Sequence, residues 1–271
     1  MNQRPVITLL TDFGERDGFI GVMKGVMMQI APQAVFIDIS HSLTAYSISS
    51  ASFLNHWSFG YFQAGTVHLC VIDPGVGTER RPIAVESQGH FFVAPDNGVL
   101  SPIFRDDPNA KIIALTNSRY WLDFVSDTFH GRDLFSPVAA HLAAGVPIEE
   151  LGEAISDPVL LPTDPPSLSK DGILCHVRYV DRFGNLVTDL DQNTFYEWAE
   201  IQGYSSQDVI ISFADTAIQG ISRAYGEKEP GDLVAVFNGY NCLEIAVTTG
   251  NASQRTGLGL NATVRVRPAT E

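Results

Sequence analysis

The stretch "VITLLTDFGERDGFIGVMKGVMMQIAPQAVFIDIS", residues 6–40, has the pattern of a strand, a helix and a second strand. Residues 6–11 form an apolar run of strand-forming residues, which is typical of a strand buried on both faces. A helix is indicated next by apolar residues at helical spacing: Phe19, Met23, Val26 and Ile30. Asp17 suits the start of that helix and Pro32 stops it. Residues 34–40 then predict the next strand of a strand-helix-strand unit.

The alternation continues through the first half of the chain. The next elements are predicted as a helix over 46–57, a strand over 66–73, a hairpin over 82–95 turning at Gln88-Gly89, and a helix over 133–146. Strands that alternate with helices favour an α/β domain whose mostly parallel sheet has helices on both faces.

The second half has a different pattern. Residues 156–172 contain four prolines and no periodicity, which is typical of a linker. Short strand-like runs then follow one another, separated by Gly, Asn and Asp: "ILCHVRYVD", "DVIISF", "DLVAVF", "CLEIAV" and "ATVRVR". The sequence therefore predicts an α/β domain over 1–156, a linker over 157–172, and a smaller all-β barrel domain over 173–271.

Composition excludes several classes of partner. The chain has 271 residues, 17 Lys and Arg against 31 Asp and Glu, and a net charge of -14. This charge argues against a nucleic-acid groove or an anionic membrane surface and suits a cationic small ligand. The three cysteines are odd in number and widely spaced, so we expect reduced thiols of a cytoplasmic protein. Neither a membrane span nor a signal-peptide pattern is expected.

Polar clusters at predicted strand ends mark candidate sites in the first domain, because such ends line the ligand crevice of α/β sheets. Asp12 and Asp17 follow the first strand and could hold a ribose diol and an ammonium; alternatively they form a turn and a helix cap. Asp73 ends the strand over 66–73, and Arg80 and Arg81 return toward it after a Pro-Gly-Val-Gly turn. That arrangement is either a binding site for a small polar molecule or a salt bridge that closes a loop.

Two further clusters in the first domain have a structural alternative. Asp96 and Asn97 precede a short helix and favour a capping turn, and His130 precedes a glycine and a charged pair at a helix start. A single histidine is more often structural than catalytic. No metal-binding spacing, phosphate-binding loop or nucleophile elbow is present in the sequence, so no metal or cofactor is predicted.

The β domain contributes two polar clusters of its own. Asp181, Phe183 and Asn185 alternate, which would place them on one face of an extended segment and suit a charged head, a flat ring and a base edge. The second cluster consists of Asn238, Tyr240 and Glu244. Each cluster could instead be an ordinary polar hairpin.

Seven motifs taken together resemble one family. They are "TDFGERDGFIGVMKGV", "DISH", "VIDPGVGTERR", "APDNGVLSP", "TFHGRDLFSPVAAHL", "VDRFGNLVTDL" and "LEIAV". Their order resembles that of S-adenosyl-L-methionine (SAM) hydrolases, also called SAM hydroxide adenosyltransferases, which are relatives of fluorinase and chlorinase. The resemblance runs from about residue 6 to residue 267. It implies an α/β domain, a β-barrel domain, and a homotrimer whose SAM sites lie between the N-domain of one subunit and the C-domain of its neighbour.

The resemblance also implies residue roles. By motif position the family's catalytic Asp-Arg-His triad falls on Asp73, Arg80 and His130, and the seven-residue interval selects Arg80 over Arg81. Asp12 matches the ribose contact. Asp17 and Asp181 match contacts to the methionine end, and Phe183 and Asn185 match the adenine side. The chain departs from fluorinases where Gly239 and Tyr240 replace a Ser-Arg pair that contacts the methionine carboxylate.

The expected reaction is hydrolysis of SAM to adenosine and L-methionine by attack of water or hydroxide on C5'. The sulfonium is already an excellent leaving group, so the protein need only place one oxygen nucleophile in line. Two alternatives remain open at this stage: a SAM-dependent halogenase that forms 5'-halo-5'-deoxyadenosine, and a nucleoside-binding sensor without turnover. A carboxylate at position 73 would repel a halide, which favours hydrolysis over halogenation.

Overall fold

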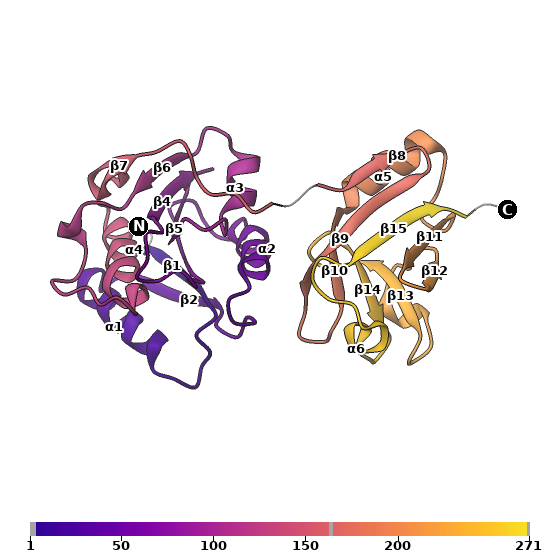
Figure 1. Ribbon diagram of the computed structural model, residues 1–271, viewed down its shortest axis with the longest axis horizontal. Helices are drawn as coiled ribbons and strands as arrows, with labels where there is room; N and C mark the ends of the chain where they lie inside the picture. The colour runs from indigo at the N-terminus through magenta and orange to yellow at the C-terminus, as the bar shows by residue number, and fades with distance from the viewer. Residues whose placement is uncertain (1–3, 163–164, 270–271) are drawn as a thin grey trace. The chain divides into compact units, whose positions relative to one another are not determined.

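The chain consists of two compact units, Met1–Leu161 and Pro162–Glu271 (Figure 1). The structure is a computed structural model, and it describes residues 4–162 and 165–269. Each unit has its own hydrophobic core. The predicted linker over 157–172 remains a prediction. Within it, Asp157 pairs with Arg81 in the first unit, and β8 (Ser167–Ser169) pairs with β9 (Gly172–Val180) in the second.

A seven-stranded sheet forms the centre of the N-terminal unit, in the order β2-β1-β3-β5-β4-β6-β7. The strands are β1 (Val6–Thr11), β2 (Val35–Ser40), β3 (Val67–Val71), β4 (Pro82–Ser87), β5 (His90–Pro95), β6 (Lys111–Ala114) and β7 (Glu153–Ala154). Pairing is parallel from β2 to β5 and antiparallel from β5 to β7. The sheet is therefore mixed, because the predicted hairpin and the two short strands beyond it add an antiparallel half to the predicted parallel one.

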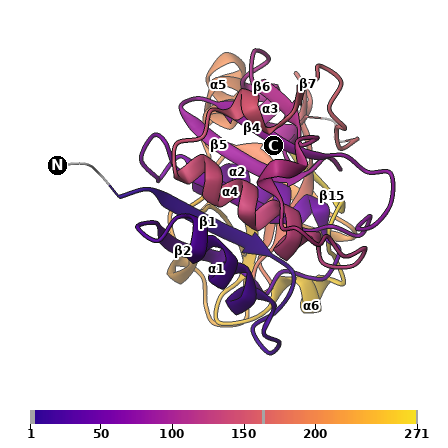
Figure 2. The same cartoon turned by 90° about the vertical axis from the view of Figure 1, so that its left-hand side faces the viewer.

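Helices cover both faces of this sheet, as predicted for an α/β unit. Helices α1 (Phe19–Ile30) and α4 (Ser136–Ala143) pack together on one face, and α2 (Ile48–Phe59) and α3 (Ser101–Asp106) on the other (Figure 1). Figure 2 shows α1 and α4 lying in front of the strands.

Local sequence explains the elements, with two corrections in α1. The hairpin turns at Gln88 and Gly89, both with positive φ, which matches the right-handed strand twist. Helix α1 begins after Gly18 without a side-chain cap, so Asp17 does not cap it. Its buried face is Ile20, Met23 and Met27. Of the four residues whose spacing indicated the helix, Met23 lies on this buried face, whereas Phe19 is 44% exposed.

The C-terminal unit is an eight-stranded antiparallel sheet that curls into a nearly closed barrel, in the order β12-β11-β15-β9-β10-β14-β13 with β8 beside β9. The strands not yet given are β10 (Leu186–Asp191), β11 (Val209–Phe213), β12 (Thr216–Gln219), β13 (Leu233–Phe237), β14 (Cys242–Val247) and β15 (Thr263–Pro268). A bridge between Ser222 and Val236 brings the two ends of this order together. The predicted all-β barrel is thus confirmed as the architecture of this unit.

Two helices in this unit were not predicted, α5 (Gln192–Gln202) and α6 (Ala252–Thr256). The local signals for α5 are present in the sequence. The Asp191 carboxylate accepts a hydrogen bond from the backbone N–H of Thr194 at 2.9 Å, and Gly203 ends the helix with a φ of 78°. The buried residues Phe195, Trp198 and Ala199 then pack the helix on the barrel.

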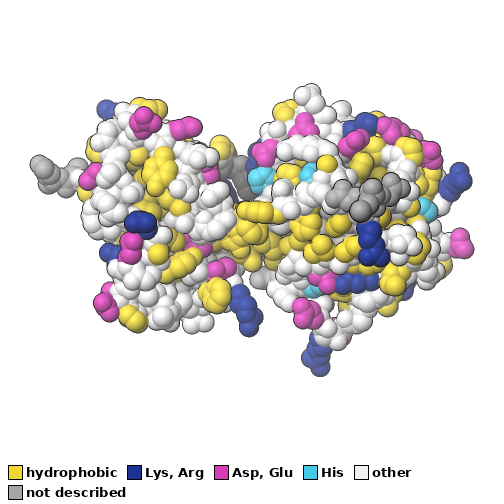
Figure 3. All heavy atoms as spheres, turned by 180° about the vertical axis from the view of Figure 1, so that it is seen from behind, with side chains coloured by type: hydrophobic (Ala, Val, Ile, Leu, Met, Phe, Trp, Pro, Cys, Tyr) yellow, Lys and Arg dark blue, Asp and Glu magenta, His cyan; other side chains and the backbone are white. Residues whose placement is uncertain are grey.

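Surface and thiol features complete the fold. On the face drawn in Figure 3, Lys and Arg side chains are separated by acidic or uncharged ones. Cys70, Cys175 and Cys242 are all free thiols, as expected. Burial raises the pKa of the Cys175 thiol to about 12. None of the helices in the described residues has the length and apolar character of a membrane span.

Candidate active site

Asp73, Arg80 and His130 meet at the end of β3 in the N-terminal unit. Nε of Arg80 donates to Oδ1 of Asp73 at 2.8 Å, and Nη2 donates to Oδ2 at 2.5 Å. The same Nη2 lies 2.7 Å from Nδ1 of His130. The side chains of Asp73 and Arg80 are only 5% and 10% exposed. A bidentate carboxylate–guanidinium pair in contact with an imidazole, mostly shielded from water, is a strongly oriented polar cluster.

The turn between Asp73 and Arg80 is built by glycine. Gly77 has a φ of 75°, and a Cβ on it would lie 2.3 Å from the carbonyl oxygen of Asp127. The turn therefore packs directly on the loop that leads to His130, and only glycine allows this approach. The Arg80 guanidinium also lies over the ring of Phe135, 5.2 Å from its centroid.

A buried carboxylate holds the loop before His130. Asp133 accepts hydrogen bonds from the backbone N–H of Ser126 at 2.9 Å, from the Ser126 hydroxyl at 2.7 Å, and from Arg132. Burial opposes ionisation of Asp133, but these hydrogen bonds outweigh it and lower its pKa. The charged pair after His130 is thus structural, and it fixes the position of the imidazole.

The hydrogen bonds also determine the state of the imidazole. Because the guanidinium has only donors, Nδ1 of His130 must accept, and the network assigns the proton of the neutral ring to Nε2. Burial lowers the pKa of His130, and the charge of Arg80 lowers it further. His130 is therefore neutral at pH 7 and presents an N–H donor at Nε2.

Arg81 has a different task from its neighbour. Its Nε and Nη2 donate to Oδ2 of Asp96 at 3.0 and 2.7 Å, and its Nη1 donates to Asp157 at 2.9 Å. Asn97 donates to the backbone oxygen of Ile72 at 2.8 Å. Arg81, Asp96 and Asn97 therefore hold loops together, and the predicted preference for Arg80 as the partner of Asp73 agrees with the geometry.

Asp12 lies beside the loop that contains His130. The ring of Phe13, the next residue, is 6.0 Å from that of Phe129, and Gly131 packs on Phe13. Oδ2 of Asp12 accepts a hydrogen bond from the backbone N–H of Tyr46 at 2.7 Å. Asp17 is exposed, and its carboxylate makes no hydrogen bond within the described residues.

In the C-terminal unit, Asp181, Phe183 and Asn185 form a tight turn rather than one face of an extended segment. The Asp181 carboxylate accepts from the backbone N–H groups of Phe183 and Asn185 at 2.9 and 2.8 Å, and from the Asn185 side chain at 3.0 Å. Gly184, with a φ of 83°, closes the turn. The prediction of a shared extended face was wrong because these local hydrogen bonds bend the chain.

Asn238, Tyr240 and Glu244 form a second cluster in this unit. Glu244 is buried and accepts from Nδ2 of Asn238 at 2.7 Å and from the Tyr225 hydroxyl at 2.8 Å. Burial raises the pKa of Glu244, although these two donors oppose the shift. Burial, with Tyr179, Asp181 and Glu244 nearby, also raises the pKa of Tyr240 to about 12. The two C-terminal clusters are thus neighbours and share a negative potential.

Sequence reasoning missed Tyr225 and Tyr179, which belong to this neighbourhood, and His41 and Tyr46, which contact the Asp12 loop. No local motif marks Tyr225, because it contacts Glu244 only through the fold of the barrel.

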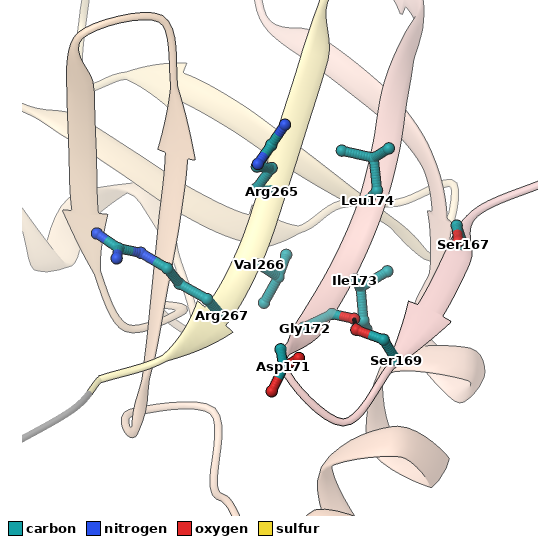
Figure 4. A pocket seen from close by; sticks show the side chains of 9 residues that line it. All are labelled: Ser167, Ser169, Asp171, Gly172, Ile173, Leu174, Arg265, Val266 and Arg267. Atoms are coloured by element: carbon teal, nitrogen blue, oxygen red, sulfur yellow. Dashed lines mark hydrogen bonds between the residues drawn. The ribbon is translucent and has the colours of Figure 1, made fainter.

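Two hollows of the described surface lie away from these residues. The first is an open groove of about 330 Å³ between β8, β9 and β15. Figure 4 shows the side chains that line it, which include Ser167, Ser169, Leu174, Arg265 and Arg267. A second hollow in the N-terminal unit is lined by Phe104, Asp107, Ile112, Ile155 and Leu160 among others. Neither contains a residue of the predicted site, so the chemistry of the clusters, and not the depth of a hollow, identifies the candidate site.

Two family models match the chain. The SAM hydroxide adenosyltransferase N-terminal domain matches residues 7–152, and the C-terminal domain of that name matches residues 175–265. A Thermus thermophilus protein named (R)-S-adenosyl-L-methionine hydrolase is 34% identical, over 97% of this chain and 99% of the relative. A fluorinase from Actinoplanes sp. is 27% identical, over 99% of both chains. The crystal structure of an uncharacterized conserved protein from Thermotoga maritima superposes with a TM-score of 0.89 at 32% identity, covering 96% of this chain and 99% of that one.

Proposed function

Because the chain belongs to the SAM hydroxide adenosyltransferase family, we propose that it hydrolyses SAM to adenosine and L-methionine. The family inferred from the seven sequence motifs is confirmed, and the chain is an enzyme of the SAM hydrolase type. The observation that carries the mechanism is the contact of Arg80 with both Asp73 and His130.

The reaction balances without a co-reactant other than water. The water oxygen forms a bond to C5' as the C5'–S bond breaks. The electron pair of the C5'–S bond stays on sulfur, which gives the neutral thioether of methionine. One proton is released per turnover. The barrier lies in presenting a poorly nucleophilic water in line with the C5'–S bond.

Asp73, Arg80 and His130 supply donors and an acceptor for that water. Within the described residues, Nη1 of Arg80 makes no hydrogen bond, and His130 presents Nε2–H. Both donors favour hydroxide character in an oxygen held between them, and the Asp73 carboxylate orients the water or accepts its proton. The same carboxylate disfavours a halide at this place.

The remaining predicted residues are assigned to substrate binding. Asp12 would accept a ribose hydroxyl, Asn185 and Phe183 would contact adenine, and Asp17 and Asp181 would face the methionine end. Asn238, Tyr240 and the buried Glu244 are assigned to the same substrate-binding region of the C-terminal unit. We propose that no metal or cofactor takes part, because the sulfonium needs no Lewis acid to leave.

We further propose that the chain forms a homotrimer in which the N-terminal unit of one subunit and the C-terminal unit of a neighbour serve the same substrate. Support comes from the family resemblance and from the division of the polar clusters between the two units. A particle mass of about three times 29.5 kDa in light scattering is the expected result. The three free thiols support a cytoplasmic location.

Product analysis tests the function. Purified protein is incubated with SAM, with and without added chloride or fluoride, and the nucleosides are separated by chromatography. We expect adenosine and methionine in equal amounts whether or not halide is present. Formation of 5'-halo-5'-deoxyadenosine would instead identify a halogenase. Tight adenosine binding without loss of SAM would identify a nucleoside sensor.

A further inference from the structure

His41 is buried beside the loop that carries Asp12, and the mechanism above does not use it. Strands β1 and β2 are parallel neighbours, with Leu10 opposite Ser40. The next residues along each strand, Thr11 and His41, therefore lie at the same sheet edge, where the predicted substrate contacts begin.

Three hydrogen bonds tie the loop after β1 to the segment after β2. Nδ1 of His41 lies 2.9 Å from the Thr11 hydroxyl oxygen, and the backbone oxygen of His41 accepts from the N–H of Gly14 at 2.7 Å. The third tie is the Tyr46 N–H bond to Asp12. These ties bracket Asp12 on both sides along the chain.

The other side of the His41 ring faces a carboxylate. Its Nε2 lies 3.0 Å from Oδ1 of Asp38, an ion-pair distance without the geometry of a hydrogen bond, and Oδ2 of Asp38 accepts from Nζ of Lys24 at 2.6 Å. This arrangement favours a proton on Nε2, which leaves Nδ1 to accept the Thr11 O–H. The Thr11 oxygen can then accept the N–H of Phe13, 3.3 Å away. The hydrogen bonds from the Phe13 N–H to Thr11 and from the Thr11 O–H to His41 therefore point in the same direction.

The backbone conformation indicates that these hydrogen bonds constrain the loop after β1. Gly14 and Tyr46 both have positive φ, 71° and 66°, and a left-handed tyrosine is unfavourable unless its surroundings impose it. Both residues are anchored by the hydrogen bonds above. Within the described residues, Oδ1 of Asp12 makes no hydrogen bond, so it is available to a substrate hydroxyl.

We infer that His41 is a positioning residue for substrate binding, which acts through Thr11 and Gly14 on the Asp12 carboxylate. The inference rests on the proposed function, in which Asp12 accepts a ribose hydroxyl. This role explains why a buried histidine follows β2. It also gives the motif "DISH", residues 38–41, a part in positioning the residue that binds the nucleoside. His41 contacts neither the nucleophile nor the leaving group in this assignment, so its loss should affect binding more than chemistry.

The test compares adenosine affinity, KM and kcat in matched variants. Thr11→Val removes the hydroxyl at nearly constant shape, Thr11→Ser keeps it, and His41→Phe removes both ring nitrogens. We expect adenosine affinity by calorimetry to fall about tenfold in Thr11→Val and His41→Phe, since one oriented hydrogen bond to a charged group is weakened. KM for SAM should rise by a similar factor while kcat changes less than about threefold. Thr11→Ser should bind nearly like the wild type. His56→Phe, at a partly exposed histidine that pairs with Asp106 away from the predicted site, should leave adenosine affinity unchanged.

A double-mutant cycle separates positioning from general structural damage. In an Asp12→Ala background, His41→Phe should cause no further loss of adenosine affinity, because the carboxylate that it positions is absent. Additive losses would overturn the inference, and so would wild-type affinity in both single variants. If the wild type hydrolyses SAM and the variants keep wild-type adenosine affinity, only the role of His41 is refuted. A wild type that does not bind adenosine refutes the inference together with the proposed function.

Discussion

Arg80 is the residue on which the candidate catalytic cluster depends, because its guanidinium contacts both of the other members. Asp73→Asn, Arg80→Ala and His130→Ala should each lower kcat by about 10²- to 10³-fold, the typical cost of losing one preorganised polar group. KM for SAM should change much less, because these groups face the nucleophile. Steady-state kinetics measure both constants.

Arg81 provides the matched control for this prediction. Arg81→Ala breaks the ties to Asp96 and Asp157 and should lower the melting temperature, yet leave kcat close to the wild-type value. Near-normal kcat in all three cluster variants would show that the catalytic assignment is wrong.

The proposed adenine contact of Asn185 can be tested in the same way. Asn185→Ala should raise KM for SAM about tenfold with a smaller change in kcat, since an adenine contact is made about equally in the ground and transition states. The variant also loses one hydrogen bond to Asp181, so its melting curve should be recorded alongside the kinetics. A lower kcat at unchanged KM would remove Asn185 from the binding role.

Residue roles could be predicted from sequence only where the partners are close along the chain or belong to a recognised motif. Asp73 and Arg80 are seven positions apart and flank one turn, so their pairing could be anticipated. Glu244 and Tyr225 are on separate segments of the barrel, and no periodicity connects them. The extended face predicted for Asp181 failed because side-chain hydrogen bonds to the backbone decide the shape of a short polar segment.

At the scale of elements, the Pro-Gly-Val-Gly turn connects the two halves of the catalytic cluster. Gly77→Ala places a Cβ against the Asp127 carbonyl and forces a positive φ on alanine, so both the turn and the loop before His130 must move. We expect destabilisation on the order of 1–3 kcal/mol and a lower kcat. Urea unfolding and kinetics check the two effects.

The matched glycine control lies on α1. Gly25→Ala meets no atom within 4 Å, and alanine favours the helix, so the variant should be as stable as the wild type or more stable. Equal behaviour of the two variants would contradict the role given to the turn.

The elements that sequence predicted well are those with strong local signals, such as β1, the hairpin at Gln88-Gly89 and the barrel strands. Helix α5 was missed although Asp191 and Gly203 mark its ends, because only three residues form its buried face and the apolar Ile201 lies outside that face, 79% exposed. In the antiparallel half of the N-terminal sheet, the hairpin was predicted but β6 and β7 were not, since pairing beyond a hairpin depends on contacts between distant segments.

At the scale of the whole molecule, a buried histidine pair ties stability to pH. Nε2 of His68 lies 3.2 Å from Nδ1 of His90, and Nδ1 of His68 lies 2.8 Å from the Thr8 hydroxyl. Burial, with His90 nearby, lowers the pKa of His68 to about 3. The unfolded chain therefore binds a proton at this position from about pH 6.5 downward, whereas the folded chain binds it only near pH 3. The free energy of unfolding should decrease as pH falls through this window, by up to about 1.4 kcal/mol per pH unit for His68 alone.

His68→Gln tests this dependence by urea unfolding at pH 7 and pH 5 and at one protein concentration. The variant should be less stable at pH 7 but should lose less stability on acidification than the wild type. An unchanged pH dependence in His68→Gln would show that other groups control it.

The division of the polar clusters between the two units makes a prediction about the proposed homotrimer. If a substrate is served by the N-terminal unit of one subunit and the C-terminal unit of its neighbour, two inactive variants should rescue one another. Asp73→Ala removes the N-terminal half, and Asn185→Ala combined with Glu244→Gln removes the C-terminal half while keeping the size of the buried side chain. Random mixing in closed trimers should make about a quarter of the sites fully wild type. Co-expressed, tag-purified mixed trimers should then show roughly that fraction of wild-type activity, whereas the separately purified variants, combined without subunit exchange, should show almost none. Verified mixed trimers without activity would mean that both halves must come from one chain.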